Sequence, residues 1–143
     1  MQDADAITVI FIAGFGPIVR DAGASRKLYA EDLALSLKEE AGGYLHTERL
    51  QGAKSFALWP LEQAAQSCFG RPEWPADVPI PQAWLEFEVD DVEEATGRLQ
   101  RRGHQLLVRS RKESWGQIVS RFLSPEGLLT ALTFTPALRA PAP

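Results

Sequence analysis

The hydrophobic positions of the chain fall into two similar runs. In each run an apolar strand ends at an aspartate, Asp21 in the first half and Asp91 in the second, and a helical pattern starts within a few residues. At the second junction Glu94 follows Asp91 by three residues, the spacing of a capping box, and the apolar helical stripe stops at Gly103. The pattern predicts one helix over about residues 24–39 and another between Asp91 and Gly103.

Stretches with strand character surround both helices. The apolar run 7–19 is interrupted by glycine and proline at 14–17, which indicates a bulge within one strand or two short strands. The strands expected after the helices are 43–50 and 53–60, with a less certain third, in the first half, and 104–110, 117–123 and 129–135 in the second. The predicted fold class is α+β: one domain over 1–143, with two βαβββ modules over about 7–60 and 82–136 and a loop over 61–81 that contains proline and tryptophan.

Composition narrows the classes of function. A chain of 143 residues that is 45% hydrophobic is long enough to bury a core as a single domain. Its formal net charge of −4, without a long basic block, argues against nucleic acid or an anionic membrane as a partner. The apolar run 7–19 is too short to cross a bilayer and is not preceded by basic residues. Because Cys68 is the only cysteine, no intrachain disulfide is possible, and we expect a cytoplasmic protein.

Several motifs carry a resemblance to a known family. They are the two strand-aspartate-helix junctions, Leu28-Tyr29 on the first helix, Trp115-Gly116-Gln117, Phe122, and the turn Ser124-Pro125-Glu126-Gly127. On these residues the chain resembles the vicinal oxygen chelate superfamily, which contains glyoxalase I, extradiol dioxygenases, fosfomycin-resistance enzymes and bleomycin-resistance binding proteins. The resemblance implies a curved mixed sheet around a ligand-binding cup, often completed by a second subunit. We therefore expect a homodimer, and the apolar first strand agrees with this expectation.

The positions where the resemblance implies metal ligands hold other residues. In metal-dependent members the first strand of each module offers a ligand about seven residues before the final aspartate, and the last strand offers a glutamate. These positions fall on Gly14, Trp84 and Ala131, and the matching place in the first module is Phe56 or Ala57. None of these side chains can bind a divalent metal. We expect no metal, no cofactor and no catalytic residues of the family's type, as in the metal-free bleomycin-resistance-like proteins.

The residues that replace the metal ligands suggest a different site. Strand alternation places Trp84, Glu86 and Glu88 on the face that the resemblance makes the wall of the cup, with Ala131 on the same face of the last strand. Aromatic rings and a carboxylate favour a flat hydrophobic or cationic ligand. The resemblance also matches Trp115 to an aromatic residue that binds drug in bleomycin-resistance proteins. The ligand-binding residues we expect are Trp59, Trp84, Glu86, Trp115, Gln117, Ala131 and His46.

Three functions remain open. The first is a metal-free protein that sequesters an aromatic or cationic compound such as a drug. The second is an enzyme of the same superfamily, lyase-, isomerase- or dioxygenase-like, with a non-standard site such as His46 with Glu48 or Glu86. A lone strand histidine is more often structural, and we expect His46 and Glu48 to point to opposite faces. The third is a structural or regulatory module whose cup is filled by its own side chains, because tryptophan in a small domain is often buried.

Overall fold

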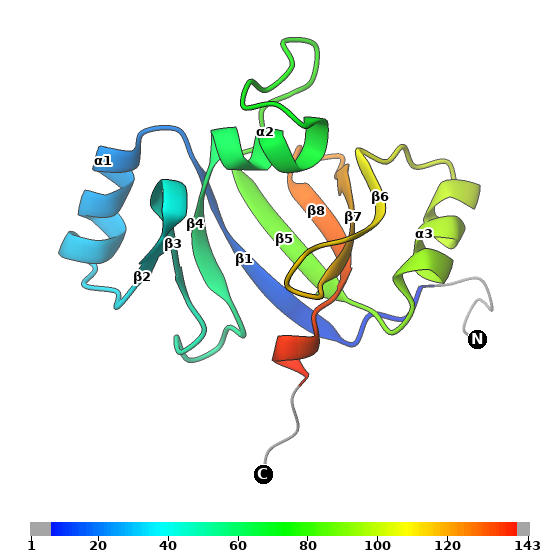
Figure 1. Ribbon diagram of the computed structural model, residues 1–143, viewed down its shortest axis with the longest axis horizontal. Coiled ribbons are helices and arrows are strands. Elements are labelled where there is room, and N and C mark those ends of the chain that lie inside the picture. The colour runs from blue at the N-terminus through cyan, green and yellow to red at the C-terminus, as the bar shows by residue number, and fades with distance from the viewer. Residues whose placement is uncertain (1–6, 140–143) are drawn as a thin grey trace.

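The computed structural model describes residues 7–139 and contains one curved sheet of eight strands with three α-helices (Figure 1). The strands lie in the order β2-β3-β4-β1-β5-β8-β7-β6. Their bounds are β1 (Phe11–Val19), β2 (Lys38–Glu40), β3 (Tyr44–Thr47), β4 (Phe56–Pro60), β5 (Ala83–Glu88), β6 (Val108–Lys112), β7 (Ile118–Leu123) and β8 (Leu129–Phe134). The helices are α1 (Ala22–Arg26), continued by a π-helical turn (Lys27–Asp32), α2 (Leu61–Phe69) and α3 (Val92–Arg101), with short 3-10 turns at Ala41–Gly43 and Pro136–Leu138.

The sheet consists of two halves with the same connectivity. β4 lies parallel to β1 in the first half, and β8 lies parallel to β5 in the second. The halves join where β1 pairs antiparallel with β5, with Gly14 opposite Glu86 and Gly16 opposite Trp84. In each half the β-strands of the sheet follow the order βαβββ, which confirms the predicted fold class.

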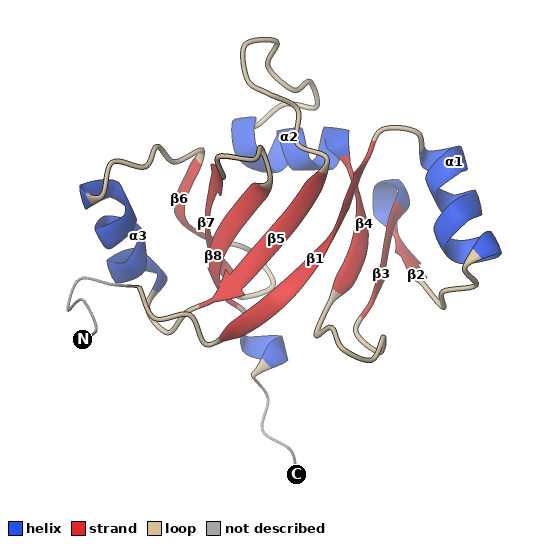
Figure 2. Cartoon of the chain, turned by 180° about the vertical axis from the view of Figure 1, so that it is seen from behind, coloured by secondary structure: helices blue, strands red, loops and turns tan. Residues whose placement is uncertain are grey.

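The two faces of the sheet are covered differently. α1 and α3 lie on the convex side, at the two ends of the sheet, whereas α2 lies across one end of the concave side (Figures 1 and 2). Val92, Ala95 and Leu99 of α3 pack with Val89 and Leu132 of the sheet, which agrees with the predicted apolar stripe. Between α1 and α3, no helix formed by residues 7–139 covers the convex side of β1 and β5 (Figure 2).

The first helix is shorter than predicted. α1 ends at Arg26, the π-helical turn ends at Asp32, and Lys38–Glu40, which we expected to end the helix, form the edge strand β2. Leu28 and Leu33, two of the residues on which the helix was predicted, are 45% and 57% exposed. Most helical stability in proteins comes from the burial of an apolar face, and here that face is only partly covered. The uncertain third strand of this half is β2, and it precedes the other two.

The segment 61–81, predicted as a loop, contains α2, so the prediction is wrong for Leu61–Phe69. The buried residues of this helix are Ala64, Ala65 and Cys68, which are small enough to let the helix approach the sheet closely. The helix stops at Gly70, whose φ of 76° is a left-handed conformation that glycine adopts at little cost. A helix of nine residues with only three small buried side chains gives a weak periodic pattern, which explains why the sequence did not reveal it.

Two local predictions are confirmed. β1 is a single strand whose register shifts between Ile12 and Gly14, which is the bulge that the glycine and proline residues indicated. Asp91 caps α3, because its Oδ1 accepts a hydrogen bond of 3.0 Å from the backbone N–H of Glu94.

Candidate functional site

A buried ion pair lies on the concave face of the sheet. Nη1 of Arg121 on β7 donates to Oε2 of Glu86 on β5 at 3.0 Å, and the exposed fractions of the two side chains are only 5% and 14%. The guanidinium carbon of Arg121 lies 4.7 Å from the ring centroid of Trp59 on β4. The site therefore combines charged groups of the second half of the sheet with an aromatic ring of the first half.

Ala131 makes this ion pair possible. β8 lies between β5 and β7, and Ala131 is the register partner of both Glu86 and Arg121. The backbones of β5 and β7 are two strand spacings apart, or about 10 Å. Because Ala131 has only a methyl group, the side chains of Glu86 and Arg121 can meet above β8. The position at which the resemblance implies a metal-binding glutamate is thus used here as space for an ion pair.

Gln117 links the ion pair to the surface. Its Nε2 donates to Thr133 Oγ1 at 2.8 Å and to Glu86 Oε1 at 3.2 Å, while its Oε1 accepts from the indole N–H of Trp115 at 3.0 Å. Gln117 is buried, but Trp115 is 68% exposed. We call the four residues Glu86, Gln117, Arg121 and Thr133 the polar cluster. Two of the residues predicted for the site, Glu86 and Gln117, belong to it, and Trp115 lies at its edge.

Glu88, which the alternation placed on the same face, serves a structural role. It is fully buried, and its Oε2 accepts hydrogen bonds of 2.7 Å from the backbone N–H of Thr135 and from Nε of Arg139. Arg139 also donates to Asp90 and to the carbonyl of Val89. The carboxylate of Glu88 therefore holds the segment after β8 against the sheet.

Trp84 is part of the core rather than the surface of the concave face. It is 5% exposed and packs with Ala64 and Cys68 of α2. Its indole N–H donates to the carbonyl of Ala57 at 3.0 Å, so the ring reaches across β1. The glycines of β1 leave room for it, because a Cβ at Gly14 would lie 2.8 Å from the Trp84 ring. Gly14, the first position at which the resemblance implies a metal ligand, thus leaves space for the indole of Trp84.

His46 lies on the first half of the sheet with both ring nitrogens engaged. Nδ1 lies 2.7 Å from Glu48 Oε2, Nε2 lies 3.2 Å from Glu40 Oε1, and the ring stacks on Tyr44 at 5.3 Å. Our expectation that His46 and Glu48 point to opposite faces is wrong, since residues two apart in an extended chain share a face. Burial alone would lower the pKa of His46, but the hydrogen bonds to Glu48 and Glu40 outweigh it and raise the pKa above its usual value.

Two other groups on this side of the sheet are held in their neutral forms. Burial, followed by the negative charge of Glu86, raises the pKa of the Tyr44 hydroxyl. Burial raises the pKa of the Cys68 thiol to about 11. Neither group is therefore activated as a nucleophile or base near neutral pH, and Cys68 serves as a small buried residue of the core.

The residues at the implied metal positions do not fit a metal. Gly14 offers no side-chain donor, Trp84 packs in the core, and Ala131 is fully buried beside the ion pair. Within the described range 7–139, no group of three or more His, Cys, Asp or Glu side chains is placed to hold a metal ion. The first-module alternatives, Phe56 and Ala57, are also buried and apolar.

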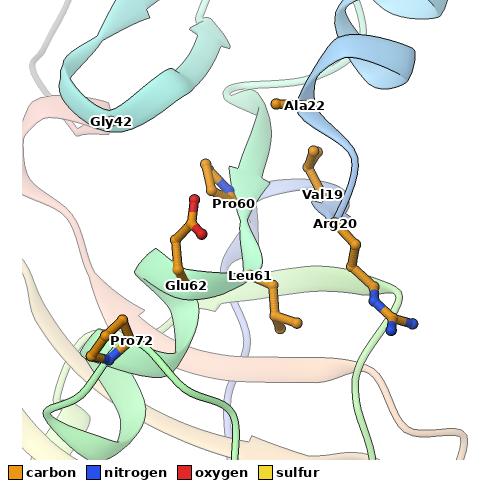
Figure 3. Close-up of a pocket in the computed structure, with 8 residues that line it drawn as sticks. All are labelled: Val19, Arg20, Ala22, Gly42, Pro60, Leu61, Glu62 and Pro72. Carbon is orange, nitrogen blue, oxygen red and sulfur yellow. The ribbon is translucent and has the colours of Figure 1, made fainter.

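Two shallow hollows lie away from the polar cluster. One, of about 240 Å³, lies where β1, β4 and α2 meet and is shown in Figure 3. The side chains of Arg20 and Glu62 extend from it in different directions, so it offers no converging polar groups. The other, of about 350 Å³, lies at the start of α3 beside β6. The first is lined by Val19, Arg20, Ala22, Gly42, Pro60, Leu61, Glu62 and Pro72, and the second by Asp90, Asp91, Val92, Glu93, Ser110, Lys112, Ile118 and Phe134.

The sequence analysis missed Arg121, the most buried charged group of the polar cluster. A signal was present, because Gln117, Val119 and Arg121 alternate along β7 and share one face. A charged residue that falls on the same strand face as buried residues is expected to be paired with another charge or to bind a ligand. The predicted site residue Trp59 lies beside Arg121 and is half-buried, so it is positioned between the polar cluster and Trp84, whose ring centroid is 6.3 Å away.

Comparisons with known proteins identify the fold. No protein-family model matches the sequence, and no curated protein sequence matches it. A glyoxalase/bleomycin resistance protein/dioxygenase superfamily member from Vibrio splendidus 12B01 superposes with a TM-score of 0.60 at 15% identity, covering 91% of this chain and all of the other. Methylmalonyl-CoA epimerase from Mycobacterium tuberculosis gives a TM-score of 0.57 at 19% identity, covering 100% of this chain and 94% of that chain.

A third similar structure is a Streptomyces coelicolor methylmalonyl-CoA epimerase variant in complex with 2-nitronate-propionyl-CoA, with a TM-score of 0.56 at 16% identity, covering 94% of this chain and 100% of that chain. In the part of the chain that the structure describes, no helix is both long and apolar enough to cross a membrane. Identities this low establish shared architecture and not shared chemistry. The chain has the fold of the glyoxalase/bleomycin resistance/dioxygenase superfamily.

Proposed function

We propose that the protein is a metal-free member of this superfamily that binds a small organic molecule at the polar cluster and sequesters it. The observation that carries the proposal is the position of Trp115. Its indole is 68% exposed, yet its N–H is hydrogen-bonded to Gln117 of a buried network. An exposed ring held in a fixed orientation beside buried polar groups suits a flat ligand that needs both contact area and hydrogen bonds.

The surroundings of the polar cluster support an aromatic or apolar ligand. The half-buried rings of Trp59 and Tyr44 lie on the first half of the sheet, and Trp115 follows the edge strand of the second half. A methylmalonyl-CoA epimerase with a TM-score of 0.56 to this chain was solved in complex with methylmalonyl-CoA, so the fold is compatible with an organic ligand.

Binding is favoured over catalysis because the polar groups are engaged with one another. Glu86 is paired with Arg121, and both nitrogens of His46 contact carboxylates. A general base must reach the proton that it removes, and here the Glu86 oxygens and the His46 nitrogens would have to share or give up the contacts that they already make. The enzyme alternative based on His46 with Glu48 or Glu86 therefore has less support than sequestration.

We also propose that the protein is a homodimer that pairs through the uncovered convex side of β1. Ile10, just before β1, and Ile12 and Phe15 within it are 45%, 50% and 44% exposed. Phe15 packs its ring edge against Phe56 and leaves its other side open. An apolar surface of this kind on the middle of a sheet is typical of a self-complementary interface. A mass near twice 15.8 kDa by light scattering, and a monomer for Phe15→Glu, are the expected results.

Calorimetric titration with naphthamide, a neutral flat amide, tests the binding proposal. Trp115→Ala is expected to weaken binding by about 1–3 kcal/mol, the usual effect of removing an aromatic contact, without unfolding the domain. Leu33→Ala is the control, because Leu33 is a similarly exposed apolar side chain that follows the π-helical turn Lys27–Asp32 in the first half of the chain. Equal affinities for the wild type and Trp115→Ala would exclude the site at the polar cluster.

A further inference from the structure

The guanidinium of Arg121 has unused hydrogen-bonding capacity. Arg121 is 4% exposed, and one hydrogen bond is described for it, from Nη1 to Glu86. Its Nε–H is buried and has no acceptor among residues 7–139. Buried donors in folded proteins are nearly always paired, and leaving one unpaired costs about 1–3 kcal/mol. The guanidinium is therefore suited to an additional acceptor.

The geometry of the free groups defines that acceptor. In a guanidinium the Nε–H and one terminal N–H point in parallel along one edge of the plane. The hydrogen bond to Glu86 uses Nη1, which lies on the other side of the group. The guanidinium carbon of Arg121 lies over the ring of Trp59, 4.7 Å from its centroid, so an aromatic surface lies beside these donors. A planar group with two oxygens matches a parallel pair of N–H donors.

The carboxylate of Glu86 is not free to select a cation. Its Oε2 accepts from Arg121 and its Oε1 accepts from Gln117. Our expectation of a cationic ligand rested on aromatic rings together with the carboxylate of Glu86, and the pairing of Glu86 with Arg121 removes the second of these grounds. A ligand cation would have to compete with Arg121 for the same carboxylate, and the positive guanidinium would repel it.

From these observations we infer that the ligand of the polar cluster carries a carboxylate, which pairs with the Nε edge of Arg121 while its flat apolar body lies along Trp59 and Trp115. This inference rests on the proposed function, and it names the chemical class of the ligand: a small aromatic carboxylic acid. The nearby glutamate keeps Arg121 in place without occupying the edge that the ligand uses.

Three probes of one shape and different charge test the inference: naphthoate, naphthamide and naphthylmethylammonium. By calorimetry, naphthoate is expected to bind the wild-type protein about tenfold or more tightly than naphthamide, because hydrogen bonds to charged groups contribute more than neutral ones. Naphthylmethylammonium is expected to bind most weakly. In the double variant Glu86→Gln/Arg121→Gln, naphthoate should lose this preference while naphthamide still binds. Arg109→Gln, which removes an exposed arginine of β6, should keep it.

The outcomes separate this inference from the proposed function. If naphthamide binds as tightly as naphthoate, or the ammonium binds most tightly, the carboxylate assignment is overturned while binding at the polar cluster stands. If none of the three probes binds saturably, both are overturned. Should the double variant unfold, the Arg121 Nε–H resonance of the wild type decides: naphthoate should move it to lower field, and an unchanged resonance in the saturated complex would contradict the inference.

Discussion

The two ends of the concave face show opposite uses of the same sheet. At the end covered by α2, Trp84 packs with Ala64 and Cys68 and closes the space with apolar contacts. At the uncovered end, Arg121 and the rest of the polar cluster remain hydrogen-bonded beneath an exposed tryptophan. In both places a position at which the resemblance implies a metal ligand is occupied by glycine, tryptophan or alanine. The difference depends on α2, which supplies a surface for packing at one end only.

This contrast shows two ways in which other residues occupy the positions where the resemblance implies metal ligands. Gly14 makes room for an indole, so that end of the concave face becomes hydrophobic core. Ala131 makes room for two long charged side chains, so the other end keeps polar groups that a ligand can use. The third function considered from the sequence, a cup filled by its own side chains, matches the packing of Trp84 at the end covered by α2.

The largest expected effect is a difference in folding stability between tryptophan variants at the two ends of the concave face. Trp84→Ala should lower the free energy of unfolding by about 3–5 kcal/mol, as truncation of a buried aromatic residue does. Trp115→Ala should change it by no more than about 0.5 kcal/mol, because that side chain is exposed. Denaturant titration followed by circular dichroism measures both. Equal losses for the two variants would remove the distinction between a packed end and a binding end.

A second variant tests how the glycines of β1 fix the position of the Trp84 ring. A Cβ at Gly16 would lie 1.9 Å from the carbonyl oxygen of Ala57 and 3.0 Å from the Trp84 nitrogen, so Gly16→Ala must displace the strand or the ring. We expect a loss at or above the upper end of the usual range for overpacking, about 1–3 kcal/mol. Gly23→Ala is the control, since its nearest contact would be 3.7 Å from Asp21. A neutral Gly16→Ala by thermal denaturation would show that Trp84 is not fixed by this contact.

Disrupting the ion pair between Glu86 and Arg121 should reduce folding stability by a smaller amount, and replacing both residues should cost less than replacing Glu86 alone. Glu86→Ala leaves the buried Arg121 without its partner and should cost about 1.5–3 kcal/mol of folding stability. Adding Arg121→Met should recover much of this loss, because a buried pair can often be replaced by apolar groups of similar size. A double-mutant cycle by denaturant titration provides the coupling free energy. Additive effects of the two substitutions would mean that the pair contributes nothing as a pair.

The smallest expected effect is the pH dependence from His46. Its pKa is raised in the folded state, so it binds a proton more tightly when folded than when unfolded. Its contribution to stability is therefore complete below the usual histidine pKa of 6.5 and is lost as the pH rises through the folded-state pKa. His46→Gln should make the melting temperature less dependent on pH over this range. A stability gain of the wild type relative to the variant with rising pH would have the wrong sign for this account.

The sequence predicted the parts of the fold that depend on local chemistry. Capping by Asp91, the bulge of β1 and the alternation of Leu132 and Ala131 on β8 follow from residues close together in the chain. The length of the first helix and the existence of α2 depend on which surfaces cover their apolar residues, which no local pattern contains.

The site was only partly predictable for the same reason. Glu86, Gln117 and Trp115 were found from alternation and resemblance, and they do meet in space. Whether Trp84 faces a ligand or the core depended on α2, which was predicted as a loop. The charge of the site depended on Arg121, whose partner lies 35 positions away in the sequence.

The indole N–H resonances of the four tryptophans offer the most direct test of the central claim, that one end of the concave face is packed core and the other end binds the ligand. In a two-dimensional nitrogen-proton spectrum, with each signal assigned by a Trp→Phe variant, titration with naphthoate should shift Trp59 and Trp115 saturably. Trp84, hydrogen-bonded to Ala57, and Trp74, hydrogen-bonded to Val78 and Pro79, should stay nearly unchanged. Saturable binding that shifts Trp84 while leaving Trp115 unchanged would contradict the account.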